Sequence, residues 1–191
     1  SAVYLGSPYA LTRMPGHKNF TAVLLGYMNT QVNNFAAAQA VFEHYVREAG
    51  LQDRIQADSA GIYGGHRGNP PDRRMRTAAL YRGFAVTHIA RQVRAMDFPD
   101  FDLVIAMDDQ NYEDLMQLAP SVEDSRKIRR MADYLTSHKI SYIPDPYYMG
   151  AEGFSHVLDL LEEACQNLLL SLSRDLGTGE SGENPELCPQ R

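Results

Sequence analysis

The strongest constraint on the fold is an alternation between short apolar runs and longer stretches with helical periodicity. The clearest apolar run is residues 103–107 (LVIAM), which is bounded by Asp102 and Asp108. A short run without polar residues is typical of a strand that is buried on both faces, as in a parallel sheet. By the same reasoning we expect a strand at residues 22–25 and a weaker one at residues 55–59.

Stretches between and after these runs have the spacing and the end signals of helices. Gly50 and Gly83 each follow such a stretch, and Pro120 stops another. The last stretch is amphipathic and places Cys165 on its apolar face, where we expect a core residue. Residues 127–131 fit a strand or a helix equally well. The predicted helices are residues 35–49, the stretch from after Asp72 to about Arg82, residues 109–118 and residues 154–172.

This order of elements predicts the α/β class, as a doubly wound, Rossmann-like parallel sheet of about four strands flanked by helices. Such sheets bind ligands outside the carboxyl ends of their strands, so we expect a site at the loops after Leu25 and before Tyr147. Both ends of the chain lack an apolar period, and the C-terminal end is rich in Gly, Glu and Pro. We therefore expect an extension over 1–20, one domain over 21–173 and a tail over 174–191.

Composition excludes several classes of function for these 191 residues. The 18 basic and 24 acidic side chains give a net charge of -6, which argues against a broad nucleic-acid surface. No apolar run approaches the roughly 20 residues of a membrane-spanning helix, so we expect a soluble protein. The two cysteines and the scattered histidines show no metal-ligand spacing, and we expect no metal and no cofactor. We expect an intracellular location, and a chain that begins at Ser1 fits cleavage of an organellar targeting segment.

Several short motifs occur in order along the middle of the chain. They are Ala40-Val41-Phe42, Asp58-Ser59-Ala60-Gly61, Gly68-Asn69-Pro70-Pro71-Asp72, His88-Ile89-Ala90-Arg91-Gln92, Phe101-Asp102-Leu103-Val104-Ile105-Ala106-Met107-Asp108 and Ile143-Pro144-Asp145-Pro146-Tyr147-Tyr148. Together they resemble the low-molecular-weight protein tyrosine phosphatase family, over roughly residues 22–172. The resemblance implies a phosphatase fold and a phosphate-binding loop between the first strand and the first helix.

In that family the loop holds a Cys, five residues and an Arg. The Cys attacks phosphorus as a thiolate, the Arg clamps phosphate oxygens, and backbone N–H groups form an anion nest. Counting back without a gap from Phe42 places Met28 at the nucleophile and Asn34 at the arginine. A thioether has no proton to lose and an amide carries no charge. Because no Cys or Arg occurs between Phe20 and His44, a shifted alignment does not restore the pair.

The resemblance also implies positions that this chain keeps. The implied positions are the general acid Asp145, the aromatic pocket walls Tyr147 and Tyr148, and the loop-supporting residues Ser59 and His88. The family's Trp falls near Gly65, and the chain has no Trp, so one wall is missing or is replaced by Tyr63. Without a nucleophile, Asp145 is more readily a loop-capping carboxylate than an acid catalyst.

These observations leave three hypotheses. The main one is a catalytically inactive member of the family that serves as a structural or protein-binding subunit of a larger assembly. Its partners would be other protein subunits, reached through the two terminal extensions. The alternatives are a module that binds phosphate or phosphotyrosine and, with less support, an active protein tyrosine phosphatase.

Overall fold

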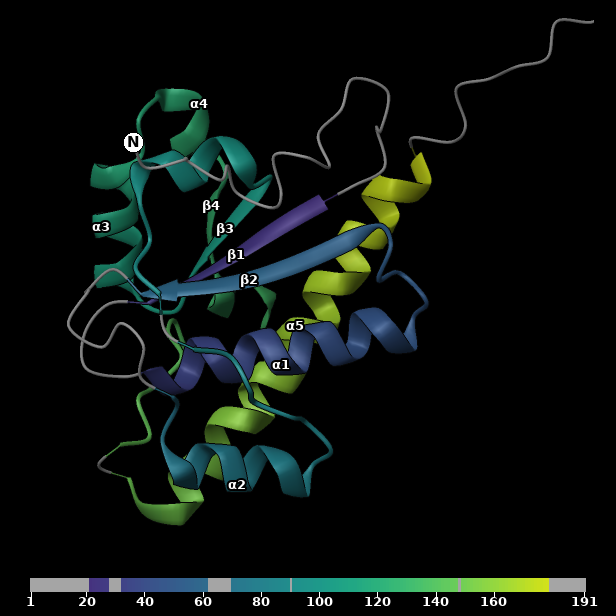
Figure 1. The fold of residues 1–191 in the computed structure, drawn as a ribbon, viewed down its shortest axis with the longest axis vertical. Coiled ribbons are helices and arrows are strands. Elements are labelled where there is room, and N and C mark those ends of the chain that lie inside the picture. The colour runs from purple at the N-terminus through teal and green to yellow at the C-terminus, as the bar shows by residue number, and fades with distance from the viewer. Residues whose placement is uncertain (1–20, 28–31, 62–69, 90, 148, 179–191) are drawn as a thin grey trace, which may run out of the picture.

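The computed structural model describes residues 21–27, 32–61, 70–89, 91–147 and 149–178 (Figure 1). Four parallel strands form one sheet with the order β2-β1-β3-β4. The strands are β1 (Thr21–Tyr27), β2 (Ile55–Gly61), β3 (Leu103–Ala106) and β4 (Ile128–Arg130). The predicted class and the predicted number of strands are thus confirmed.

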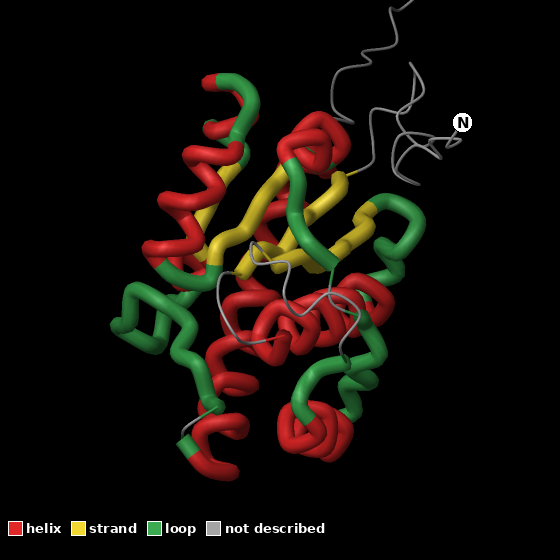
Figure 2. Tube along the Cα trace, turned by 60° about the vertical axis from the view of Figure 1, so that its left-hand side comes forward, coloured by secondary structure: helices red, strands yellow, loops and turns green. Residues whose placement is uncertain are grey.

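Helices cover both faces of this sheet, and Figure 2 shows the strands lying between two groups of helices. The α-helices are α1 (Val32–Glu48), α2 (Arg73–Tyr81), α3 (Asp109–Leu118), α4 (Val122–Ser125) and α5 (Gly150–Thr178). Two short 3-10 helices, η2 (Ala95–Asp100) and η3 (Met131–Tyr134), complete the described elements. The alternation in the sequence predicted neither these 3-10 helices nor α4.

Both faces of the β3 strand are buried, as its apolar run predicts. Val104 and Ala106 face the core shared with α3 and η2, whereas Ile105 faces the larger core shared with α1, α2 and α5. All three side chains are fully buried. Since successive residues of a strand point to opposite faces, a strand covered on both sides needs apolar residues throughout.

Several helix ends follow the polar signals in the sequence. The Asp108 carboxylate accepts a hydrogen bond from the backbone N–H of Asn111, so the residue that closes β3 also caps α3. Asp72 caps α2 by accepting from the N–H of Arg74. Gly83 follows α2 with φ of +87°, a left-handed conformation that glycine adopts without strain.

Several element boundaries differ from the expectation, among them the start of α1, which lies at Val32 instead of residue 35. The ambiguous stretch 127–131 divides into a strand that pairs with β3 and the buried Met131, which begins η3. The last helix extends beyond 154–172, and its end at Thr178 lies inside the range assigned to the tail. Among the described residues, no helix is both long and apolar enough to span a membrane.

Candidate functional site

The candidate site lies at the carboxyl end of β1. The chain passes from β1 to β2 on one side of β1, and from β2 it crosses to β3 on the other side, so the direction of the connections reverses at β1. Ligands of doubly wound sheets bind at such a reversal. β1 ends at Tyr27 and α1 begins at Val32, so the first turn of α1 lies beside this edge (Figure 1).

Asn34 lies in that first turn and points into the protein. Its side chain is fully buried, and its Nδ2 donates a hydrogen bond to the carbonyl oxygen of Pro144 at 2.8 Å. Its Oδ1 has no hydrogen-bond partner among the described residues. The amide therefore joins α1 to the loop that carries Asp145, across 110 positions of sequence.

The Asp145 loop is attached to the end of β3. The N–H of Ile143 donates to the carbonyl oxygen of Met107 at 2.8 Å, which fixes the start of the loop at the same edge. Asp145 is half-buried, and its Oδ1 accepts from the N–H of Tyr147 at 2.9 Å. Burial raises the pKa of Asp145, and the hydrogen bond from Tyr147 opposes that shift. This is the hydrogen bond of a loop-capping carboxylate, and the pKa direction is the one that a general acid needs.

Tyr147 lies at the surface beside a cation. Its side chain is 45% exposed, and the Arg74 guanidinium stacks 5.2 Å from its ring centroid. The same guanidinium stacks 4.8 Å from the ring of Phe154 in α5 and pairs with Asp72 at 2.8 Å. A guanidinium between two aromatic rings holds them in place through cation–π contact.

A buried carboxylate organises the neighbouring strand end. Asp58 in β2 accepts from the N–H of Ser59 at 2.8 Å, lies 3.2 Å from Nε2 of His88 and pairs with Arg91 at 2.6 Å. Arg91 also pairs with Asp97 at 3.0 Å. Burial raises the pKa of Asp58, but the hydrogen bond from His88 and the charge of Arg91 outweigh it, so the pKa lies below its usual range. Asp58 is therefore ionised at neutral pH.

Ser59 is joined to α1 through a glutamine. The fully buried Ser59 hydroxyl donates to Oε1 of Gln39 at 2.7 Å. Nε2 of Gln39 donates to Glu43 at 2.8 Å and approaches the carbonyl oxygen of Ala57 at 3.4 Å. This network holds α1 against β2 below the candidate site.

The structure gathers most of the implied site positions at one edge. Asn34 joins the Asp145 loop, which carries Tyr147, and Ser59 and His88 both contact Asp58. Met28, Tyr63, Gly65, Tyr148 and Cys188 lie outside the described residues. Four further residues, Gln39, Asp58, Arg74 and Arg91, contribute contacts at this edge that the sequence did not predict. Asp58 and Arg91 stand within two of the quoted motifs, whereas no signal identified Gln39 or Arg74.

Cys165 is buried in the core between α5 and α1. Its Sγ lies 3.7 Å from the carbonyl oxygen of Ala38, and burial raises the pKa of the thiol. The predicted core position is confirmed. The described part of the chain contains no group of three or more His, Cys, Asp or Glu side chains that could hold a metal ion.

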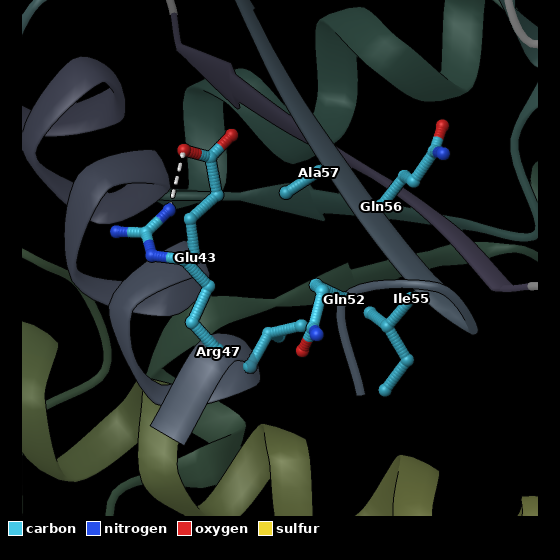
Figure 3. A pocket seen from close by; sticks show the side chains of 7 residues that line it. Glu43, Arg47, Gln52, Ile55, Gln56 and Ala57 are labelled. Carbon is cyan, nitrogen blue, oxygen red and sulfur yellow. Dashed lines mark ion pairs between the residues drawn. The ribbon is translucent and has the colours of Figure 1, made fainter. Parts of the chain in front are cut away.

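A cleft of about 350 Å³ opens elsewhere, between α1 and β2. Figure 3 shows Glu43 and Arg47 of α1 as an ion pair at 3.8 Å, with Ile55 and Ala57 of β2 beside them. None of the implied site residues lines this cleft. It is therefore separate from the site at the carboxyl edge.

Comparison with known proteins agrees with this geometry. The family described as low molecular weight phosphotyrosine protein phosphatase matches residues 35–178. A Synechocystis protein named for such phosphatases is 42% identical over 140 residues, which cover 73% of this chain and 89% of that protein. The low molecular weight protein-tyrosine-phosphatase YfkJ of Bacillus subtilis is 37% identical over 139 residues, or 72% of this chain and 87% of YfkJ.

A solved structure shares the fold closely. The crystal structure of a protein tyrosine phosphatase from Entamoeba histolytica superposes with a TM-score of 0.78 at 36% identity. It covers 81% of this chain and 98% of the other. The chain therefore belongs to the low molecular weight phosphotyrosine protein phosphatase family.

Proposed function

We propose that this chain is a catalytically silent member of its family that acts by binding other protein subunits. The observation that carries the proposal is the burial of the Asn34 side chain and its hydrogen bond to a loop carbonyl. At the position implied for the phosphate-clamping arginine, an uncharged side chain is buried and donates to a loop carbonyl. An amide used in this way offers no charged fork to a phosphate.

The sulfur-containing side chains at position 28 and in the described core support the same proposal. The position implied for the nucleophile is Met28, whose thioether cannot ionise. The one cysteine among the described residues, Cys165, is fully buried with a raised pKa. A nucleophilic cysteine needs the opposite environment, one that is accessible and lowers the pKa. The family match begins at residue 35, directly after Asn34, which also fits a rewritten loop.

A phosphate-binding role has less support, because Arg91 and Arg74, the two arginines that contact the site residues, are already engaged. Arg91 pairs with Asp58 and Asp97, and Arg74 pairs with Asp72. An anion would have to compete with these carboxylates. The raised pKa of Asp145 keeps the active alternative open to test, since that direction suits a general acid.

Turnover of p-nitrophenyl phosphate at mildly acidic pH tests catalytic silence, with Bacillus subtilis YfkJ as the active reference. We expect no turnover above the buffer blank, because removal of a catalytic nucleophile costs on the order of a millionfold in a serine protease. An Asp145→Ala variant is purified in parallel, and an equal rate in that variant would mean that Asp145 is not involved or that a contaminant is present. Turnover at the rate of YfkJ that falls in Asp145→Ala would contradict catalytic silence.

The native mass of the chain in an extract tests the protein-binding role. We expect the chain to migrate well above its own 21.4 kDa. Migration as a free monomer at its natural abundance would refute a role as a subunit.

A further inference from the structure

A second cleft, of about 370 Å³, lies between α2 and the start of α5. Ala151 and Phe154 of α5 form one wall, and Ala78 and Tyr81 of α2 form the other. Tyr81 is 89% exposed, and its neighbour Leu80 is 67% exposed. Large apolar side chains left open beside a cleft mark an interaction surface.

Arginines edge this apolar cleft. Arg73 and Arg74 line it, and Arg76 follows in the same first turns of α2. Arg74 pairs with Asp72 and stacks on the Phe154 ring, and the charge of Arg76 also acts on Asp72, whereas no carboxylate pairs with Arg73 among the described residues. The chain as a whole carries a net charge of -6, so this basic edge is a local feature. It fits an acidic segment that also carries an apolar side chain.

The chain itself contains such a segment. Residues 180–187 (ESGENPEL) lie outside the described part and include Glu180, Glu183, Glu186 and Leu187, with no basic residue. The carboxylates complement Arg73 and Arg76, and Leu187 offers an apolar side chain to the cleft. No other stretch of the two terminal regions combines these features, because residues 1–20 contain no acidic residue.

The carboxylates of Glu180 and Glu183 cannot reach the basic edge of their own chain, because these residues lie only two and five positions beyond Thr178. Phe154, beside Arg74, and Thr178, the last residue of α5, are 24 positions apart in one helix, or about 36 Å at 1.5 Å per residue. Glu186 is eight positions beyond Thr178 and extends at most about 28 Å from it. Figure 1 shows α2 near one end of the molecule and the end of α5 near the other. The acidic segment of a second copy has no such restriction.

We infer that the cleft between α2 and α5 binds residues 180–187 of a second copy of this chain. This inference rests on the protein-binding part of the proposed function and is independent of catalytic silence. A tail that enters the next molecule makes a heterologous contact. Repeated heterologous contacts build an open-ended filament unless two copies exchange tails and form a closed dimer.

Sedimentation velocity of the full chain at increasing concentration tests the inference. We expect the mean sedimentation coefficient to rise with concentration and to fall again at high salt, because the contact is partly ionic. Arg73→Glu combined with Arg76→Glu is expected to weaken association at least about tenfold, and so is Tyr81→Ala. Arg126→Glu combined with Arg129→Glu changes the net charge equally in α4 and β4 and serves as the matched control.

Exchanging the charges of the tail and the cleft between two variants tests whether the tail is the segment that binds in the cleft. Glu180→Lys, Glu183→Lys and Glu186→Lys in the tail are expected to weaken association alone and to restore it when mixed with the Arg73→Glu, Arg76→Glu variant. Thermal unfolding of each variant excludes loss of folding. A chain that stays monomeric at every concentration overturns the inference, even if turnover assays find the chain silent. Association that the cleft variants leave unchanged, or that charge exchange does not restore, also overturns it.

Discussion

The Asp58→Asn substitution tests whether the buried carboxylate holds the site together. Asp58 is only 7% exposed and receives hydrogen bonds from Ser59, His88 and Arg91. The substitution keeps the shape of the side chain but removes its charge. Arg91 is then left partly buried with Asp97 as its remaining ionic partner.

The expected loss follows from the burial of the pair. Removing one partner of a buried ion pair costs about 3–5 kcal/mol. The Arg91 side chain is 31% exposed and keeps Asp97, so solvent and the second carboxylate reduce the loss to about 2–3 kcal/mol. For a domain of this size that lowers the melting temperature by about 5–10 °C.

Urea unfolding at neutral pH, followed by circular dichroism, measures this loss. Asp159→Asn is the control, because the Asp159 side chain is 52% exposed and its pair with Arg82 lies at the surface. We expect the control to change stability by less than about 0.5 kcal/mol. A loss in Asp58→Asn no larger than in the control would refute the reasoning.

The pH dependence of the same variant follows from the lowered pKa of Asp58. A carboxylate with a depressed folded pKa contributes its full stability above the unfolded value, 3.8 for Asp58. That contribution is lost as the pH falls through the folded pKa. The difference between wild type and Asp58→Asn should therefore shrink below pH 3.8.

Three further predictions follow. Met28→Cys with Asn34→Arg should stay far slower than Bacillus subtilis YfkJ in p-nitrophenyl phosphate turnover, because Thr30, Gln31 and Phe35 still stand where the resemblance implies Gly, Asn and Ser; a rate equal to that of YfkJ would contradict this. In a Cys188→Ser background, Cys165 should react with a disulfide reagent only as fast as the chain unfolds, since the thiol is buried with a raised pKa. Hydrogen bonds from the N–H groups of Ser137 and Thr136 and from His138 lower the pKa of Glu163 from 4.5 to about 2. Glu163→Gln should therefore lower the melting temperature at neutral pH, and the difference from wild type should shrink as the pH falls from 4.5 to about 2.

The sequence predicted the sheet because its strands carry strong local signals. β3 is apolar throughout, and both of its faces are buried. α3 lies between an aspartate cap and Pro120, and its predicted bounds match the structure. The short elements η2, η3 and α4 have no comparable signal. They form where tertiary contacts bury residues such as Phe98 and Met131, and a periodicity argument cannot detect such contacts.

The site was predictable only in part. The resemblance implied site positions for Asn34, Ser59, His88 and Asp145, but the partners of these residues depend on contacts between distant segments. Gln39 bonds Ser59 across 20 positions, and Arg91 pairs with Asp58 across 33. No spacing rule connects such pairs. A buried carboxylate beside two basic groups becomes evident only when β2 and the segment 88–91 are seen together.

The bond between Asn34 and Pro144 is the physical reason for which we expect the two substitutions at positions 28 and 34 to be too few for phosphatase activity. The family resemblance implies a charged fork at this position, facing a phosphate. Here the amide instead holds the Asp145 loop against α1. Replacing Asn34 with Arg removes that hydrogen bond, at about 1 kcal/mol, and places a guanidinium where a fully buried side chain now lies. Burying that charge without a partner costs more than the lost bond, so the loop that carries Asp145 has to move. We therefore expect a cysteine and an arginine at positions 28 and 34 to displace Asp145, the residue implied as the acid that would act with them.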